Sequence, residues 1–285
     1  MSVATLSMRR RRFSSVSLSG FHDIAYVEWG DDGVAPPVIC VHGLTRNGRD
    51  FDRLAAALAA ARKVVCPDVV GRGRSAWLPD PAAYSYAQYC TDMTALIARL
   101  DCEAVDWVGT SMGGLIGMML AALPNTPIRR LVLNDIGPFV PRQAIRRIAD
   151  YVGKDPVFAE LAGLEAYLRQ VHAPFGALDD AAWMHLALHG HRRLPDRRYG
   201  LAYDPVIARS FQDAPDQDVD LWPIWEKLRC PLLVLRGAES DLLLPDTARR
   251  MAEKAELVEI TSVGHAPSLM VEDQIATVSA WLARS

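Results

Sequence analysis

The stretch of residues 104–117 constrains the fold of this chain more than any other. An apolar run short enough for one strand leads into Gly109-Thr110-Ser111-Met112-Gly113, and an apolar helical run, 115–123, follows. Glycine tolerates the close approach of the two arms of such a tight turn because it has no Cβ. A Gly-x-Ser-x-Gly turn between a strand and a helix places its serine at the helix N-terminus, where the helix dipole favours negative charge. The pattern therefore predicts that Ser111 is a nucleophile.

Short apolar runs alternate with helical patterns along most of the chain. The expected strands are 13–17, 24–29, 37–41, 63–67, the run before Ser111, 128–134, 230–236 and 257–260, and the expected helices are 51–61, 86–100, 115–123, 245–255 and 273–284. The first two strands would form an antiparallel hairpin. This alternation predicts an α/β fold, in which a mostly parallel sheet carries helices on both faces.

Residues 138–228 break the alternation. They carry helical patterns at 144–152, 160–171 and 181–188 and no strand-like run. An insertion after the sixth strand would cover the strand ends, where α/β proteins bind ligands. We therefore expect an α/β core of residues 1–137 and 229–285 and a helical cap, or lid, of residues 138–228.

Charge and composition disfavour several classes of partner. A formal net charge of −3 gives no strong attraction to nucleic acid or an anionic membrane, and no apolar run approaches the length of about 20 residues that spans a bilayer. Arg9 to Arg12 precede a polar stretch and not the apolar segment of an export signal, so we expect a loose tail up to about residue 10 and a cytoplasmic protein. Five cysteines, without a metal-ligand pair, are expected to be reduced thiols. The expected partner is a small molecule, and the expected assembly is a monomer or homodimer.

The order of the motifs resembles that of the α/β-hydrolase superfamily, and in particular proteobacterial serine carboxylesterases with a helical cap. The motifs that carry the resemblance are His42-Gly43, the turn 68–75, the Ser111 turn, Asp241 and Gly264-His265. The resemblance implies an eight-stranded, mostly parallel sheet. It also implies a catalytic triad in the chain order serine, acid, histidine.

A serine hydroxyl needs an imidazole to accept its proton and a carboxylate to orient that imidazole. His265 fits the position of the imidazole best because it lies on a loop after the last expected strand. The other histidines are His22 near the start, His42 beside the expected oxyanion loop, and His172, His185, His189 and His191 in the expected cap.

The expected acid is Asp241, which follows the strand 230–236, where most of the superfamily carries its acid. Asp135 follows the previous strand, where some members place theirs, and it remains an alternative. Glu239, closer to the end of the strand, is a third candidate.

The resemblance also implies an oxyanion hole made of two backbone N–H groups, those of Met112 and Leu44. Arg46, Trp183 and Trp222 are expected to contact the substrate. No cofactor is expected, since the turn 68–75 lacks the lysine of a P-loop. No metal is expected either, because His189-Gly190-His191 has no acidic or cysteine partner at ligand spacing.

A serine at this turn argues against the haloalkane dehalogenases and epoxide hydrolases of the fold, which use aspartate there. We expect a serine-dependent hydrolase of short- to medium-chain carboxylic esters that works through an acyl-enzyme. The string Tyr203-Asp204-Pro205 resembles esterases of which some cleave polyester oligomers of hydroxy acids. Two alternatives remain: a C–C bond or lactone hydrolase of an aromatic degradation pathway, with Arg192 and Arg193 available for a substrate carboxylate, and a non-catalytic receptor built on the same fold.

Overall fold

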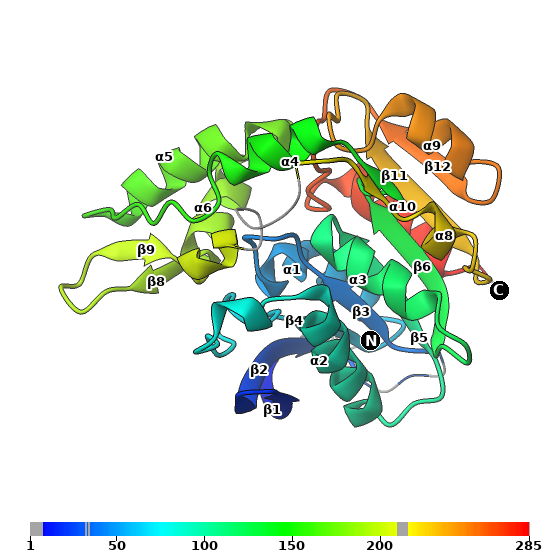
Figure 1. The fold of residues 1–285 in the computed structure, drawn as a ribbon, viewed down its shortest axis with the longest axis horizontal. Coiled ribbons are helices and arrows are strands. Elements are labelled where there is room, and N and C mark those ends of the chain that lie inside the picture. Colours follow the sequence, from blue (N-terminus) through cyan, green and yellow to red (C-terminus); the bar gives the residue numbers. More distant parts are fainter. Residues whose placement is uncertain (1–7, 32, 34, 210–215, 285) are drawn as a thin grey trace, which may run out of the picture.

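Eight strands form one twisted sheet in the computed structural model, which describes residues 8–31, 33, 35–209 and 216–284. The order in the sheet is β1-β2-β4-β3-β5-β6-β11-β12 (Figure 1). These strands are β1 (Arg9–Ser17), β2 (Gly20–Trp29), β3 (Val38–Val41), β4 (Val64–Pro67), β5 (Val105–Thr110), β6 (Ile128–Asn134), β11 (Leu232–Gly237) and β12 (Glu256–Ile260). β2 pairs antiparallel with β1 and β4, and the other neighbours are parallel. The predicted mostly parallel, eight-stranded α/β fold is thereby confirmed.

Helices cover both faces of this sheet, as the continuous apolar strands require. On one face, α1 (Asp52–Leu58) and α10 (Glu272–Leu282) pack over side chains such as Cys40 and Val108. On the other face, α2 (Tyr86–Arg99), α3 (Met112–Ala121), α8 (Trp222–Trp225) and α9 (Pro245–Met251) pack over a larger apolar layer. Trp107 is fully buried in that layer and donates a hydrogen bond from Nε1 to the Gly113 carbonyl at 3.0 Å. This contact ties β5 to the first turn of α3.

Residues 141–209, which form most of the chain between β6 and β11, lie beyond the carboxyl ends of the parallel strands (Figure 1). Their α-helices are α4 (Arg142–Ala149), α5 (Leu161–Val171) and α6 (Asp180–His189). The 3-10 turn η3 (Ala173–Phe175) lies between α5 and α6, and η4 (Pro205–Ala208) follows α6. Near the two ends of the chain between β6 and β11, β7 (Phe139–Val140) pairs antiparallel with β10 (Val219–Asp220). Residues 210–215 lie outside the described residues.

This segment also contains a hairpin, so the expectation that it holds no strand was wrong. β8 (His191–Arg193) pairs antiparallel with β9 (Tyr199–Leu201). Strands of three residues are too short to show an alternating pattern. The pair is supported by the Arg193 guanidinium, which lies 4.0 Å from the centre of the Tyr199 ring.

The amino-terminal arginines belong to the sheet. β1 begins at Arg9, so the expected loose tail does not extend to residue 10; residues 1–7 lie outside the described residues. The Arg9 guanidinium pairs with Glu28 at 3.0 Å, and the Arg12 guanidinium pairs with Asp23 at 3.0 Å. Among the described residues, the helices are all too short or too polar to cross a membrane.

Candidate active site

Ser111 stands at the tip of the turn between β5 and α3. Its φ of 51° and ψ of −115° lie in a region that residues other than glycine rarely adopt. The glycines on either side permit this turn. A Cβ on Gly109 would lie 2.4 Å from the Gly113 backbone, and one on Gly113 would lie 2.0 Å from the Val41 carbonyl oxygen. The turn therefore holds the serine hydroxyl away from the sheet, at the N-terminus of α3.

Three side chains form a hydrogen-bonded chain at this edge of the sheet. The Ser111 hydroxyl donates to His265 Nε2 at 2.9 Å, and His265 Nδ1–H donates to Asp135 Oδ2 at 2.7 Å. Ser111 follows β5, Asp135 follows β6, and His265 follows β12. This geometry lets the imidazole accept the hydroxyl proton while the carboxylate fixes its tautomer.

Asp135 is fully buried, and its carboxylate is held by more than the imidazole. Oδ1 accepts the Gly237 N–H at 2.7 Å, and Oδ2 accepts the Ser240 hydroxyl at 2.5 Å. The φ of Asp135 is 54°, a left-handed conformation that aspartate and asparagine tolerate better than most residues. The carboxylate thus connects the end of β6 to the end of β11.

The structure corrects the expected acid. The Asp241 side chain is half-exposed and binds the Arg147 guanidinium at 2.9 Å, so it does not reach His265. The loop after β11 turns at once, with the Ser240 N–H donating to the Gly237 carbonyl at 2.9 Å. This turn directs Ser240 inward to Asp135 and leaves Asp241 at the surface. The third candidate is Glu239, whose backbone N–H donates a hydrogen bond to the Val263 carbonyl at 2.9 Å.

The two backbone N–H groups expected at the oxyanion hole flank the serine. Met112 is the first residue of α3, where an N–H has no carbonyl partner one turn earlier. Leu44 lies in the loop after β3, and this loop passes so close to the serine that a Cβ on Gly43 would lie 3.8 Å from the Ser111 Cβ. No described residue supplies an acceptor to the backbone N–H of Met112 or Leu44.

Buried side chains fix the loop that carries Leu44. Arg72, fully buried, donates from Nε to the Leu44 carbonyl at 2.8 Å. His42 donates from Nδ1 to the Gly43 carbonyl at 2.7 Å and accepts the Val69 N–H on Nε2 at 2.9 Å. Burial lowers the pKa of His42 to about 4, so the imidazole is neutral and keeps this tautomer. The loop is therefore rigidly positioned beside the serine.

A cavity of about 60 Å³ adjoins Ser111 and His265. The segment between β6 and β11 lines it with Arg147, Ile148, Tyr151, Val171, His172 and Phe175. The His172 and Phe175 rings stack with their centres 4.7 Å apart. Burial and the charges of Arg46 and His265 lower the pKa of His172 well below its usual value. The cavity lining therefore combines apolar side chains, charged side chains and the buried imidazole of His172.

Of the three residues expected to contact substrate, only Arg46 is part of the described lining of the cavity. Arg46 lines the cavity, but its guanidinium makes two hydrogen bonds of 2.8 Å to Asp50. Trp183 is buried away from the cavity, with the Arg169 guanidinium 5.6 Å from its ring centre. Trp222 lies in α8 under the Arg250 guanidinium, 3.6 Å from its ring centre. Neither tryptophan is part of the described lining of the cavity, so the structure does not support either expectation.

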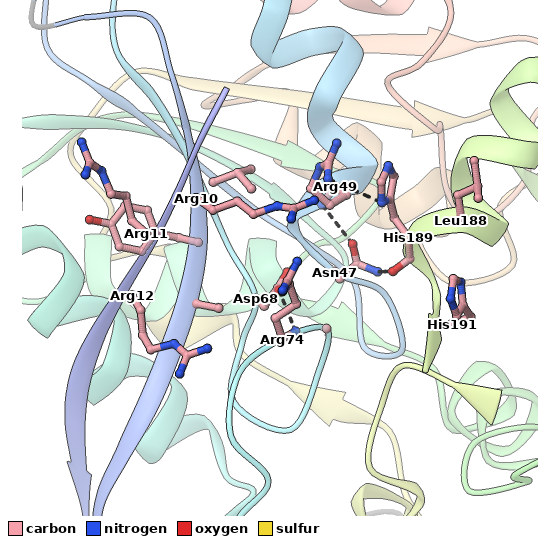
Figure 2. A pocket seen from close by; sticks show the side chains of 14 residues that line it. Arg10, Arg11, Arg12, Asn47, Arg49, Asp68, Arg74, Leu188, His189 and His191 are labelled. Atoms are coloured by element: carbon pink, nitrogen blue, oxygen red, sulfur yellow. Dashed lines mark hydrogen bonds between the residues drawn. The ribbon is translucent and has the colours of Figure 1, made fainter. Parts of the chain in front are cut away.

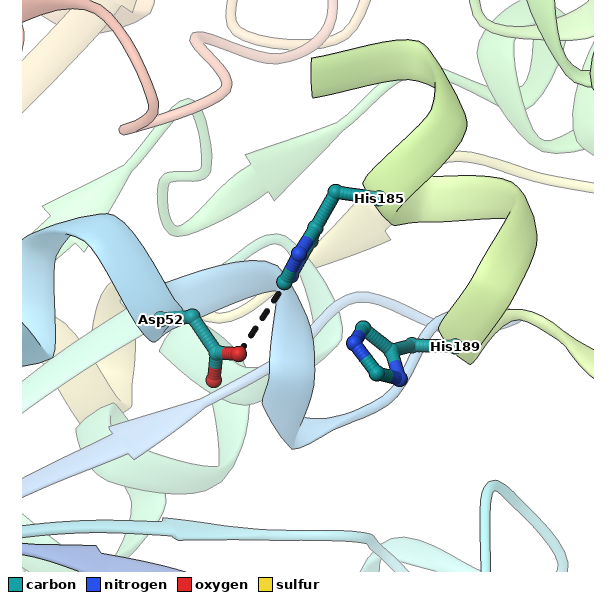
Figure 3. A group of neighbouring side chains, drawn as sticks. All are labelled: Asp52, His185 and His189. Atoms are coloured by element: carbon teal, nitrogen blue, oxygen red, sulfur yellow. Dashed lines mark ion pairs between the residues drawn. The ribbon is translucent and has the colours of Figure 1, made fainter. Parts of the chain in front are cut away.

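Asp52, His185 and His189 form a second group that could hold a metal ion (Figure 3). Their ligand atoms lie within 4.8 Å of one another. The sequence pattern missed this group because Asp52 is in α1, far along the chain from the two histidines of α6. The Asp52 carboxylate already accepts the Arg49 Nε–H at 2.8 Å. A cation here would have to displace a guanidinium, which disfavours a metal.

Comparisons with known proteins show the family of this chain. Residues 38–280 match the model of the Alpha/beta hydrolase family. A 3-hydroxybutyrate-oligomer hydrolase of Cupriavidus necator is 44% identical over 272 residues, covering 92% of this chain and 93% of that protein. A crystal structure of a putative hydrolase from Rickettsia typhi superposes with a TM-score of 0.90 at 32% identity, covering 98% of this chain and 100% of that chain. An alpha/beta hydrolase from Novosphingobium aromaticivorans gives 0.88 at 36% identity, covering 99% and 100%.

Proposed function

The chain belongs to the alpha/beta hydrolase family and is an ester-hydrolysing enzyme, and from this premise we propose that it is a serine-dependent carboxylesterase acting on short oligomers of 3-hydroxybutyrate. The observation that carries the proposal is the hydrogen-bonded chain from Ser111 through His265 to Asp135, which opens on a small cavity. The named activity of the 44% identical relative supports the substrate class.

The proposed reaction starts with attack of the Ser111 hydroxyl oxygen on the ester carbonyl carbon, while His265 Nε2 accepts the hydroxyl proton. The Met112 and Leu44 N–H groups hold the tetrahedral oxyanion, and a donor of this kind is worth about 3 kcal/mol of barrier. The bond between the carbonyl carbon and the ester oxygen then breaks, His265 gives its proton to that departing oxygen so that it leaves as an alcohol, and an acyl-enzyme remains. Water, deprotonated by the same imidazole, attacks the acyl carbon and releases the acid and Ser111. No cofactor takes part in this scheme.

We further propose that residues 138–228 act as the cap that selects the acyl group. Phe175 and Ile148 supply apolar contacts, and His172 supplies the polar group that a hydroxyacyl chain needs. A neutral imidazole can hydrogen-bond to the 3-hydroxyl group, which a plain butyryl chain lacks. A site built to pair a hydroxyl discriminates against an analogue without it, because a buried polar group is then left unpaired.

The test is release of 3-hydroxybutyrate from its dimer and trimer, followed by chromatography, together with hydrolysis of p-nitrophenyl esters from acetate to decanoate. Wild type should cleave the oligomers, and Ser111→Ala should lose at least about 10³-fold in kcat/KM on every ester. Cleavage of the p-nitrophenyl esters without cleavage of the oligomers would refute the substrate class alone. Full activity of Ser111→Ala would refute the serine mechanism.

A further inference from the structure

A second, larger cavity of about 550 Å³ lies between β1, the loop after β3 and the end of α6 (Figure 2). Its lining shares no residue with the cavity beside Ser111. The charged and titratable side chains of the described lining are Arg10, Arg11, Arg12, Tyr26, Arg49, Asp68, Arg74, His189 and His191. The volume falls within the range of small-molecule sites, roughly 300–1,000 Å³.

Three of the five arginines in the described lining of this cavity form ion pairs: Arg11 with Glu28, Arg12 with Asp23 and Arg49 with Asp52. Neither Arg10 nor Arg74 forms an ion pair with any residue that the structure describes. Asp68 is the one acidic residue in the described lining, and it is already engaged. Its carboxylate accepts the Gly48 N–H at 2.8 Å and the Arg74 N–H at 2.8 Å, and burial raises its pKa to about 6. The guanidinium groups of Arg10 and Arg74 are therefore available to an anionic ligand.

The charges of Arg49 and Arg10 both act on the His189 imidazole. Burial and the charges of Arg49, His185 and Arg10 together lower its pKa to about 4, and the charge of Asp50 acts in the opposite direction. Arg49 Nη1 lies 3.5 Å from His189 Nδ1. Figure 2 shows the Arg10 side chain extending from β1 toward Arg49, so two guanidinium groups from distant parts of the chain approach one neutral imidazole. Like charges held close together are costly, and an anion placed between them removes that cost.

The same charges decide between a metal and an anion at this end of α6. A divalent cation bound by Asp52, His185 and His189 would meet the Arg49 guanidinium at the carboxylate and the Arg10 charge beside the imidazole. An anion would meet the guanidinium groups of Arg10 and Arg74, with Asp68 as the acidic residue of the described lining. The planar fork of an arginine matches the oxygens of a phosphate group, and several arginines favour a ligand with more than one negative charge.

We propose that this cavity is a binding site for a small molecule that carries a diphosphate group, held by Arg10, Arg49 and Arg74. The site is adjacent to the catalytic loop. Asn47 lies three residues after Leu44. Its Oδ1 accepts the backbone N–H of Arg49 at 3.0 Å, and its Nδ2 donates to the His189 carbonyl at 2.9 Å. The binding proposal does not depend on the esterase proposal, because the two cavities have separate walls.

The experiment is isothermal titration calorimetry of the whole chain at low salt with inorganic diphosphate, ADP and adenosine. Wild type should bind ADP or diphosphate with a Kd below about 1 mM, adenosine should not bind, and added NaCl should weaken binding because the contacts are ionic. A Kd for ADP about tenfold below that of diphosphate would identify a nucleotide-like ligand that uses the remaining volume. Equal values would identify the diphosphate group alone as the ligand.

Two variants and one control test the residues. Arg10→Gln and Arg74→Gln should each raise the Kd about tenfold, since each removes a charge-assisted contact. Arg249→Gln removes the same charge from α9, where the exposed arginine pairs with Asp246, and it should leave the Kd within about twofold. Circular dichroism verifies the fold of each variant. Absence of binding to wild type, or unchanged binding to both Arg10→Gln and Arg74→Gln, would overturn the proposal.

Discussion

Replacing Asp135 by asparagine tests which carboxylate serves His265. Asparagine is the appropriate substitution because it keeps the size of the side chain and tolerates the φ of 54° at this position. Its oxygen can still accept the Gly237 N–H that now binds Oδ1 at 2.7 Å. Its amide nitrogen then faces His265 Nδ1 as a donor. The imidazole must become an acceptor there, which moves its proton to Nε2, the atom that has to accept the Ser111 proton.

The size of the effect follows from this change of tautomer. The same exchange in a Ser-His-Asp protease lowers kcat by about 10⁴, and each tenfold is about 1.4 kcal/mol of barrier, so the loss is about 5 to 6 kcal/mol. The carboxylate here is fully buried and lies 2.7 Å from the imidazole, so water screens the interaction little. We therefore expect Asp135→Asn to lose about 10⁴ in kcat with little change in KM.

The assay is hydrolysis of p-nitrophenyl butyrate, with thermal unfolding recorded for each variant so that a loss of fold is not mistaken for a loss of chemistry. Asp241→Asn is the matched control. Its side chain is half-exposed and bound to Arg147, so kcat should stay within about twofold of wild type. A folded Asp135→Asn that keeps a tenth of the activity, or an Asp241→Asn that loses a hundredfold, would refute the assignment of Asp135.

Three further outcomes are expected. Folded His42 has a pKa of about 4 and an unfolded histidine one of about 6.5, so the unfolded chain binds more protons at this position between these values. Acidification through this window should therefore remove about 3 kcal/mol of the free energy of unfolding through His42, in addition to what other groups contribute. Urea titrations of His42→Gln should show a loss that is smaller than that of wild type by about this amount. Phe175→Ala should raise KM for p-nitrophenyl butyrate about tenfold, whereas Trp222→Ala should not change it; equal effects would contradict the described cavity. Gly113→Ala places a Cβ 2.0 Å from a backbone oxygen of β3 and should unfold the chain by circular dichroism, while Gly163→Ala, whose Cβ meets only ordinary contacts, should be tolerated.

Strong local patterns predicted most of the fold. The strands of the core are continuous apolar runs, and β6 was expected at the residues that the structure assigns to it. The Ser111 turn was predictable because two glycines and the flanking elements leave few other conformations. His265 was predictable from its place after the last strand, and the structure puts it beside Ser111.

The acid was harder to predict because neighbouring strands end at the same edge of the sheet. Asp135 and Asp241 both follow apolar strands, and their local sequences do not say which side chain turns inward. The choice depends on the turn at Ser240 and on the hydrogen bond from the Gly237 N–H, which are tertiary features. The structure does not support the expected substrate contacts of Trp183 and Trp222 for a related reason. Large apolar side chains favour burial, but burial alone does not say against which surface they pack.

The position of Asp135 also bears on how relatives of this chain should be compared. Its carboxylate accepts hydrogen bonds from the Gly237 N–H at the end of β11 and from the Ser240 hydroxyl just after it. Side chains that follow β6 and β11 therefore meet at the same point beside His265. An acid can therefore migrate during evolution from one strand end to the other while the histidine stays where it is. An alignment that matches residues column by column would score such a pair of enzymes as lacking a shared acid. A superposition of their carboxylates would reveal the equivalence.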